Sequence, residues 1–224
     1  RGDRAPPEKF AKRAVELNPG NATVWDVYRS SVLEPTGRLD EALVAQRRAV
    51  SLDPLNVPIA FRLAALLNYL RRCDEAVRQA QLNFELDAKF ILGYLVVARC
   101  HESNGNFTEA IAAWRKIKRP WAPDKVLDEL QAVVDSPAGK TDRKAYWRAR
   151  LAWARRYAET APDQFYFTAV FAAQAGEHDE AFRYLDRAIA QRERELVSLK
   201  VDPQFDPIRK DPRFAGVLKR LNLS

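Results

Sequence analysis

The chain has no methionine, only two cysteines and two histidines, and no long run of apolar residues. Two isolated thiols do not provide the disulfide framework of a small secreted domain, and the Cys and His residues lack the spacing of a four-ligand zinc site. A membrane helix needs about 18 or more consecutive apolar residues, and residues 1–13 lack the apolar core of a signal peptide. We therefore expect no metal, no cofactor and no membrane segment, and a cytoplasmic location is favoured. Since no methionine starts the chain, we expect a fragment or a processed product.

The 224 residues are 47% hydrophobic and 30% charged, which is typical of a folded protein and not of a disordered tail. The formal net charge is +7. Such basicity is found in nucleic-acid-binding proteins and also in helical proteins with arginine-rich solvated faces. The place of the charge along the chain decides between these two interpretations.

Two short motifs recur at a nearly constant spacing. Leu-Asn/Asp-Pro ends at Pro19 and Pro54, 35 residues apart, and a similar Leu-Asp-Ala ends 34 residues later at Ala88. An acidic or hydroxyl residue followed by Glu-Ala also recurs, with alanines at Ala42, Ala76, Ala110 and Ala181. The first three of these alanines are 34 residues apart. Self-similarity at this period predicts an array of packed helix pairs.

Each motif has a physical reason within a helix pair. Glycine tolerates the left-handed conformation that ends many helices, and the predicted first helices end near Gly37, Gly105 and Gly176. Four side-chain oxygens are predicted to cap the second helices, and the glutamate after each complements the helix dipole. These predicted caps are Asp40, Asp74, Thr108 and Asp179. The alanine that follows suits a close helix crossing, and Ala76→Leu is expected to cost about 1–3 kcal/mol by overpacking.

These segments resemble tetratricopeptide repeats, which are helix–turn–helix units of 34 residues. The early aromatic of that pattern is present as Trp25, Tyr94 and Phe165. The small residue at its eighth position is present as Ala64, Ala98 and Ala169. The first unit departs from the pattern, because Arg29 occupies the small position and one extra residue lies near residues 34–37. The resemblance implies an all-α fold: a right-handed superhelical α-solenoid of about five helix pairs, forming a single domain over 1–224.

The predicted boundaries follow from the repeat. Residues 8–18 are predicted to form the second helix of a repeat whose first helix is missing. The clear repeats are 22–55, 56–90, 91–120 and 162–192. A diverged helix pair fills 121–161, with helices over 124–135 and 142–159 and a break at residues 136–139. A C-terminal cap fills 193–224, where three Asp-Pro steps make stiff turns and Phe205, Ile208 and Phe214 can seal the last repeat.

A second resemblance covers residues 140–222. The Tyr146–Arg150 segment and the Asp-Pro-rich ending are similar to those of bacterial proteins in which such repeats follow a winged-helix, adenylate-cyclase or Ser/Thr-kinase domain. This resemblance implies the regulatory or sensory part of a larger bacterial signalling protein.

The repeat family also implies a concave face, lined by the first helices, that binds a protein or peptide. On this face we expect Phe61, Tyr69 and Tyr166 as apolar anchors, Asn68 as a partner for a peptide backbone, and Arg99 and Glu102 as charged contacts. The alternative that these side chains simply pack against their neighbours stays open, as does a homo-oligomer. The lysine and asparagine with which chaperone-docking members clamp a carboxylate are absent, because Asp26 and Ser30 or Phe61 and Ala65 stand at those positions.

No catalytic constellation is recognisable. The chain has no glycine-rich phosphate loop and no Ser or Cys nucleophile beside a recognisable base. His101 falls at a position that is usually a core aromatic in the repeat family, and His178 falls in a turn between helices. We therefore predict that the chain is not an enzyme.

A nucleic-acid-contacting module is the alternative function. Residues 113–160 contain twelve Lys/Arg and six Asp/Glu, with aromatic side chains among the cations. Cations interleaved with aromatics can grip single-stranded nucleic acid. A solvated arginine-rich helix explains the same pattern, and no known nucleic-acid motif is present, so nucleic acid is the less favoured partner.

Overall fold

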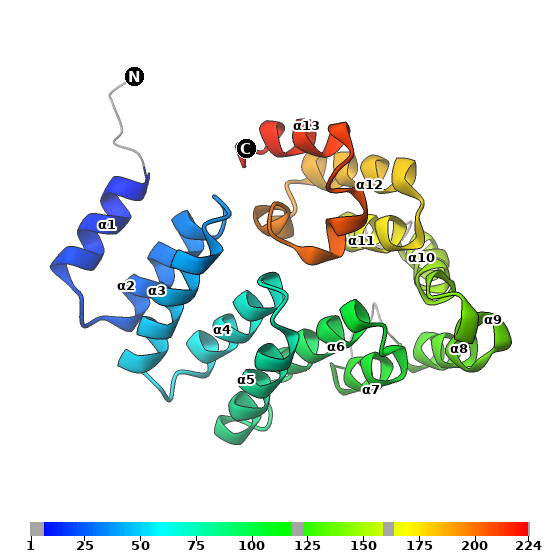
Figure 1. The fold of residues 1–224 in the computed structure, drawn as a ribbon, viewed down its shortest axis with the longest axis horizontal. Coiled ribbons are helices and arrows are strands. Elements are labelled where there is room, and N and C mark those ends of the chain that lie inside the picture. The colour runs from blue at the N-terminus through cyan, green and yellow to red at the C-terminus, as the bar shows by residue number, and fades with distance from the viewer. Residues whose placement is uncertain (1–6, 118–122, 159–163, 224) are drawn as a thin grey trace. The chain divides into compact units, whose positions relative to one another are not determined.

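The computed structural model describes residues 7–117, 123–158 and 164–223. The described residues contain helices and turns and no strand, so the predicted all-α class is confirmed. Helices that follow one another in the chain pack against one another. The chain divides into two compact units, unit 1 (Arg1–Cys100) and unit 2 (His101–Ser224). Figure 1 labels their helices.

Unit 1 consists of successive helix pairs. Its elements are α1 (Pro7–Leu17), α2 (Ala22–Tyr28), the π-helix η1 (Arg29–Leu33), α3 (Leu39–Leu52), α4 (Val57–Tyr69), α5 (Cys73–Leu86) and the first part of α6 (Leu92–Asn104). The helix α1 corresponds to the predicted unpaired helix, and α2 with α3 and α4 with α5 correspond to the repeats predicted over 22–55 and 56–90. These pairs make direct contact, as do α3 and α4.

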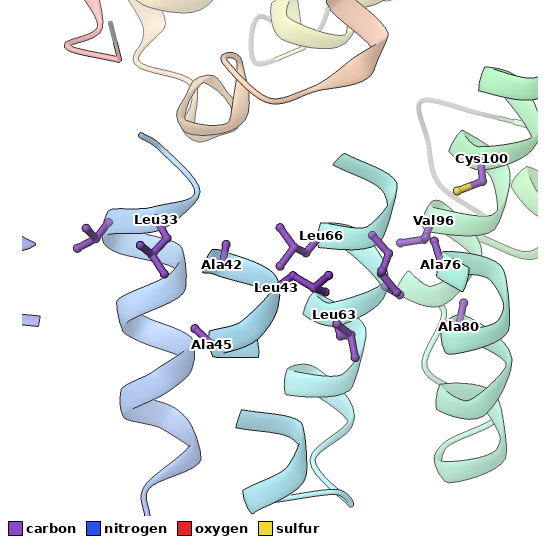
Figure 2. Close-up of a cluster of buried hydrophobic side chains, with 13 residues drawn as sticks. Leu33, Ala42, Leu43, Ala45, Leu63, Leu66, Ala76, Ala80, Val96 and Cys100 are labelled. Carbon is purple, nitrogen blue, oxygen red and sulfur yellow. The ribbon is translucent and has the colours of Figure 1, made fainter. Parts of the chain in front are cut away.

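The repeated alanines lie in the core of unit 1. Ala42 on α3 and Ala76 on α5 are both completely buried and belong to one hydrophobic cluster that runs from η1 to α6. Figure 2 shows how Leu63 and Leu66 of α4 lie in this cluster, with Val96 of α6 at one end. A side chain larger than alanine would not fit at these crossings, which explains why the repeat keeps a small residue there.

The turns between paired helices use a left-handed residue, as predicted. Gly37, Gly105 and Gly176 have φ angles of 78°, 79° and 91°. The second repeat has Arg71 at the corresponding place, with φ 60°. A residue with a Cβ is strained in this conformation. Arg71 therefore departs from the glycine pattern of the other turns, and the sequence motifs did not predict it.

The prediction of the helix caps was wrong. The helix α3 starts at Leu39 and α5 at Cys73, one residue before Asp40 and Asp74, and no side chain caps either helix. The helix α12 (His178–Gln191) likewise starts before Asp179. Thr108 lies inside α7 (Phe107–Ile117). These residues therefore lie in the first turn, where the aspartates and glutamates still favour the helix through its dipole.

The extra residue of the first repeat is absorbed inside the helix. The α-helical hydrogen bonds of α2 give way to a five-residue π-helix at η1, in which the amide of Glu34 donates to the carbonyl of Arg29 at 2.9 Å. A single inserted residue produces this wider turn without ending the helix. The departure in spacing and the presence of Arg29 at a normally small position therefore occur at the same place.

Unit 2 contains the predicted diverged pair, the last repeat and the C-terminal cap. Besides the end of α6, its elements are α7, α8 (Asp124–Asp135), α9 (Pro137–Thr141), α10 (Lys144–Ala158), α11 (Phe165–Ala175), α12, the 3-10 helices η2 (Arg194–Ser198) and η3 (Pro203–Ile208), and α13 (Pro212–Arg220). The helix predicted over 124–135 ends where expected, but the break predicted at residues 136–139 is shorter, because Ser136 caps the short helix α9 that begins at Pro137. In the cap, η3 packs against α11 and α13 packs against α12.

Candidate interaction surface

A stripe of partly exposed side chains runs along α4. Phe61, Ala65 and Tyr69 are one helical turn apart, so they lie on one side of the helix, and each is partly exposed. The ring of Phe61 meets the ring of Phe90 edge-on, with centroids 5.4 Å apart. Tyr69 also interacts within the chain. The stripe therefore offers two aromatic side chains with a small residue between them.

A second stripe runs along the first part of α6. Leu92, Leu95 and Arg99 share one side of this helix by their spacing, and Leu92 is 37% exposed. Side chains of α4 and α6 pack in the same hydrophobic cluster. We call these two stripes together the α4/α6 surface. It comprises Phe61, Ala65, Tyr69, Leu92, Leu95 and Arg99.

Asn68, which was predicted to meet a peptide backbone, is 3% exposed and faces the protein interior. Its amide Nδ2 lies 3.2 Å from Sγ of Cys100 and 3.9 Å from Sγ of Cys73. These contacts connect α4 to α5 and α6. Asn68 therefore holds unit 1 together and is not part of the α4/α6 surface.

Glu102, another predicted contact, lies at the centre of a buried polar network in unit 2 and is 1% exposed. Its Oε1 accepts hydrogen bonds from Trp114 Nε1 and the Tyr146 hydroxyl, both at 2.8 Å, and from the guanidinium of Arg150. Its Oε2 accepts from Gln204 Nε2 at 3.2 Å. A carboxylate bonded by four donors, one of them the cation of Arg150, is stable without water, and its burial keeps it from contacting a partner.

Arg150 makes this network stable. Its side chain is buried, and its guanidinium lies over the rings of Trp114 and Phe171, at 4.7 Å and 4.3 Å from their centroids. The buried carboxylate and the aromatic faces together compensate for the lost hydration of the cation. No local sequence pattern predicts this pairing, because Glu102 and Arg150 are 48 residues apart.

Tyr166 is buried as well, and the C-terminal cap covers it. Its hydroxyl donates to Oδ2 of Asp202 at 2.9 Å, and its ring meets that of Phe205 with centroids 5.2 Å apart. Two helical turns further along α11, Gln174 Nε2 donates to the backbone carbonyl of Gln204 at 2.7 Å. The segment 202–205 therefore lies along the side of α11 on which the sequence placed a partner-binding residue.

Unit 1 contains a buried charged cluster of its own. The guanidinium of Arg29 is hydrogen-bonded to Asp26 at 3.0 Å, to Gln46 at 2.9 Å and to Glu34. Arg62 pairs with the second oxygen of Asp26 at 2.7 Å. The π-helix at Arg29 thus coincides with a site where a cation and two carboxylates replace the expected small residue. The sequence signal for this site was the arginine at the eighth repeat position.

Most arginines described in the basic stretch 113–160 have acidic partners. Arg115 pairs with Asp128 at 2.6 Å and Arg148 with Asp142 at 2.5 Å. Arg155 pairs with Glu180, and Arg150 is buried as described above. Lys118 and Arg119 lie outside the described residues. The nucleic-acid alternative stays a prediction from composition.

A pocket of about 320 Å³ in unit 2 has a mixed lining of basic and polar residues (Arg143, Lys144, Gln174 and His178) and of Trp147, Ala173, Gly176 and Pro207. The guanidinium of Arg143 donates to the carbonyl of Ser103 at 2.7 Å, near the C-terminal end of α6. A cation at this end of a helix complements the helix dipole. The charge of Arg143 thus already stabilises the fold.

Within residues 7–117, 123–158 and 164–223, no three His, Cys, Asp or Glu side chains gather closely enough to hold a metal ion. No helix in that part of the chain is both long and apolar enough to span a membrane. A search of the chain against protein-family models gave no match, and no curated protein matches it significantly.

Proposed function

We propose that the chain is a protein-interaction module and that unit 1 binds a short peptide segment of a partner on the α4/α6 surface. One observation supports this most: α11, which corresponds to α4 in the repeat, already binds such a segment, supplied by the chain itself. The two helices correspond through a constant offset of 105 residues, which brings Ala64 onto Ala169 and the motif alanine Ala76 onto Ala181.

The same offset relates the candidate surface to the covered one. Phe61 corresponds to Tyr166, and Tyr69 corresponds to Gln174. On α11 these positions bind a segment through a ring-to-ring contact and a hydrogen bond to a backbone carbonyl. On α4 both positions carry aromatic side chains that are partly exposed. Aromatic side chains are enriched among the residues that dominate binding energy.

The chemistry of the surface limits the ligand. Phe61 and Tyr69 favour an aromatic or large aliphatic side chain in the peptide, as Phe205 supplies to α11. Arg99 interacts within the chain and also adds a positive charge to this surface, which favours an acidic side chain nearby, in keeping with the formal net charge of +7. We therefore propose a short segment that combines one large apolar residue with one or more acidic residues.

A selection of displayed peptides against the whole chain tests this proposal. Calorimetry then compares the selected peptide with wild type, Phe61→Ala and Tyr69→Ala. We expect each substitution to weaken binding by about 10-fold or more, since truncating a central aromatic commonly costs about 2 kcal/mol.

Val44→Ala is the matched control, because Val44 is an apolar side chain that is 69% exposed on α3, away from the α4/α6 surface. It is expected to leave the affinity unchanged. An equal loss in Val44→Ala, or a selected peptide whose affinity is unaffected by Phe61→Ala and Tyr69→Ala, would contradict the proposal.

The resemblance of residues 140–222 extends the proposal to a regulatory or sensory role within a bacterial signalling protein. The coding region that surrounds this chain tests that role. A winged-helix, cyclase or kinase domain encoded in frame supports it, and a coding region with no effector domain contradicts it.

A further inference from the structure

Two thiols from separate helices contact the same buried amide inside unit 1. Cys73 is the first residue of α5, and Cys100 lies on α6, where Figure 2 shows its sulfur at the end of the buried cluster. Both are free cysteines, and each thiol shifts the pKa of the other. The amide of Asn68 reaches both sulfurs, at 3.9 Å and 3.2 Å. A buried amide that contacts both thiols holds them in one place.

The two thiols differ in access and in acidity. Cys73 is partly exposed, and the hydrogen bond from Cys100, supported by that from Asn68, lowers the pKa of its thiol. Cys100 is buried, and the interaction with Cys73 together with burial raises the pKa of its thiol. The thiolate is the reactive form of cysteine. Cys73 is therefore the residue that an oxidant reaches first, and Cys100 is the buried thiol beside it.

We propose that Cys73 and Cys100 form a reversible dithiol–disulfide site whose substrate is a small peroxide. The thiolate of Cys73 attacks one peroxide oxygen, the O–O bond breaks, and for hydrogen peroxide the other oxygen leaves as water after taking up a proton. Cys73 is then a sulfenic acid. The sulfur of Cys100 attacks the sulfur of Cys73, an S–S bond forms, and the hydroxyl leaves as a second water with the proton of Cys100. Two thiols are oxidised by two electrons, and one peroxide is reduced to two waters.

The placement of the thiols favours this product over a modification of one cysteine. A disulfide requires sulfurs about 2.05 Å apart and Cα atoms within about 7 Å. Both sulfurs lie within 4 Å of the same amide nitrogen, so the two thiols are already neighbours, which favours a bond between them. The bond would connect α5 to α6. This inference does not depend on the proposed peptide ligand.

The test treats the whole chain with hydrogen peroxide at low protein concentration, blocks remaining thiols with a maleimide, and digests the product with trypsin. Cleavage after Arg72, Arg78, Arg99 and Arg115 places the two cysteines in separate peptides, 73–78 and 100–115. We expect these two peptides to be joined by a bond that dithiothreitol breaks, and the monomer to have lost both thiols together.

Two single variants test the assigned roles, with circular dichroism to establish that each is folded. In Cys100→Ser, Cys73 is expected to stop at the sulfenic acid, which dimedone traps. In Cys73→Ser, Cys100 is expected to stay reduced under the same treatment. The proposal is overturned if wild-type Cys73 is trapped or overoxidised while Cys100 stays reduced, or if the only disulfide joins two chains.

Discussion

The helices α4 and α11 occupy the same place in the repeat, but their corresponding side chains have different environments. On α11, Tyr166 is buried under the C-terminal cap, whereas on α4 the corresponding Phe61 is partly exposed. The segment 202–205, most of which lies in the 3-10 helix η3, contacts α11 through one ring, one carboxylate and one backbone carbonyl. This side of a first helix can therefore bind a short segment of chain. The comparison is also the basis for proposing that α4 binds a segment of another protein.

The two units also differ in how they bury charge. In unit 2, Arg150 and Glu102 connect α10 to α6, and Gln204 adds the cap to the same network. In unit 1, the cluster around Arg29 connects η1 and α2 to α3, and Arg62 of α4 pairs with its Asp26. The first network reaches from α6 to the C-terminal cap, and the second surrounds an irregular helix. Removing a charge from each network should therefore change the unfolding free energy by different amounts.

The largest effect is expected for Arg150→Ala. The substitution leaves the carboxylate of Glu102 buried without its cation, which typically costs about 3–5 kcal/mol of unfolding free energy. Urea denaturation followed by circular dichroism measures the change. Arg148→Ala is the control, because its ion pair with Asp142 is half exposed and should be worth less than about 1 kcal/mol. Similar losses in the two variants would show that the buried network does not stabilise unit 2.

Phe205→Ala tests how much the packing of the C-terminal cap on α11 stabilises the protein. Phe205 is completely buried, and removing its ring should destabilise the protein by about 3 kcal/mol, since the cap can relax into part of the cavity. Phe61→Ala removes a ring at the corresponding open position and should cost about 1 kcal/mol, because that ring is already partly in water. Denaturant titration of both variants measures the difference. Equal losses of unfolding free energy would mean that the ring on α4 is as deeply buried as the ring that covers α11.

Much of the fold follows from local patterns. The buried alanines Ala42 and Ala76 and the left-handed glycines were predicted because each reflects a steric requirement within a short stretch of chain. The caps were predicted wrongly for a physical reason. Asp40 and Asp74 are favourable anywhere in a first turn, so their presence does not fix the residue at which the helix starts.

The candidate site was less predictable, because its environment depends on residues far away in the sequence. Phe61, Tyr69 and Arg99 lie at partly exposed positions, and their role in binding stays a prediction. Glu102 and Tyr166 are covered by the segment 202–205, and no local pattern tells which first helix such a segment will cover. The peptide ligand itself remains a prediction.

A smaller effect is expected at the turn between α4 and α5. Arg71 has φ 60°, where the corresponding turns have glycine. Arg71→Gly removes the strain of a left-handed residue with a Cβ and should raise the unfolding free energy by about 1 kcal/mol. Thermal unfolding measures the gain. Gly105→Ala makes the opposite change at the corresponding turn and should lower stability, so a gain in both variants would contradict the steric explanation.

The smallest effect concerns the start of α13. The carboxylate of Asp211 accepts the amide of Arg213 at 2.9 Å, and the Arg213 guanidinium lowers the pKa of Asp211 from 3.8 to about 2. Because the folded pKa is the lower one, this stabilisation is present above pH 3.8 and is lost as the pH falls towards about 2. Carbon-detected NMR should show the low pKa, and Arg213→Ala should raise it. Lys219→Ala removes a cation from the far end of α13 and should leave it unchanged.

The most direct test of peptide binding is to map where a selected peptide binds, by amide chemical shifts of the whole labelled chain. The largest shifts are expected on Phe61, Ala65, Tyr69 and the first turns of α6, and α11 and the segment 202–205 are expected to change little. Shifts centred on α11, with the cap released, or spread over the basic stretch 113–160, would contradict the claim that α4 and α6 form the open binding surface.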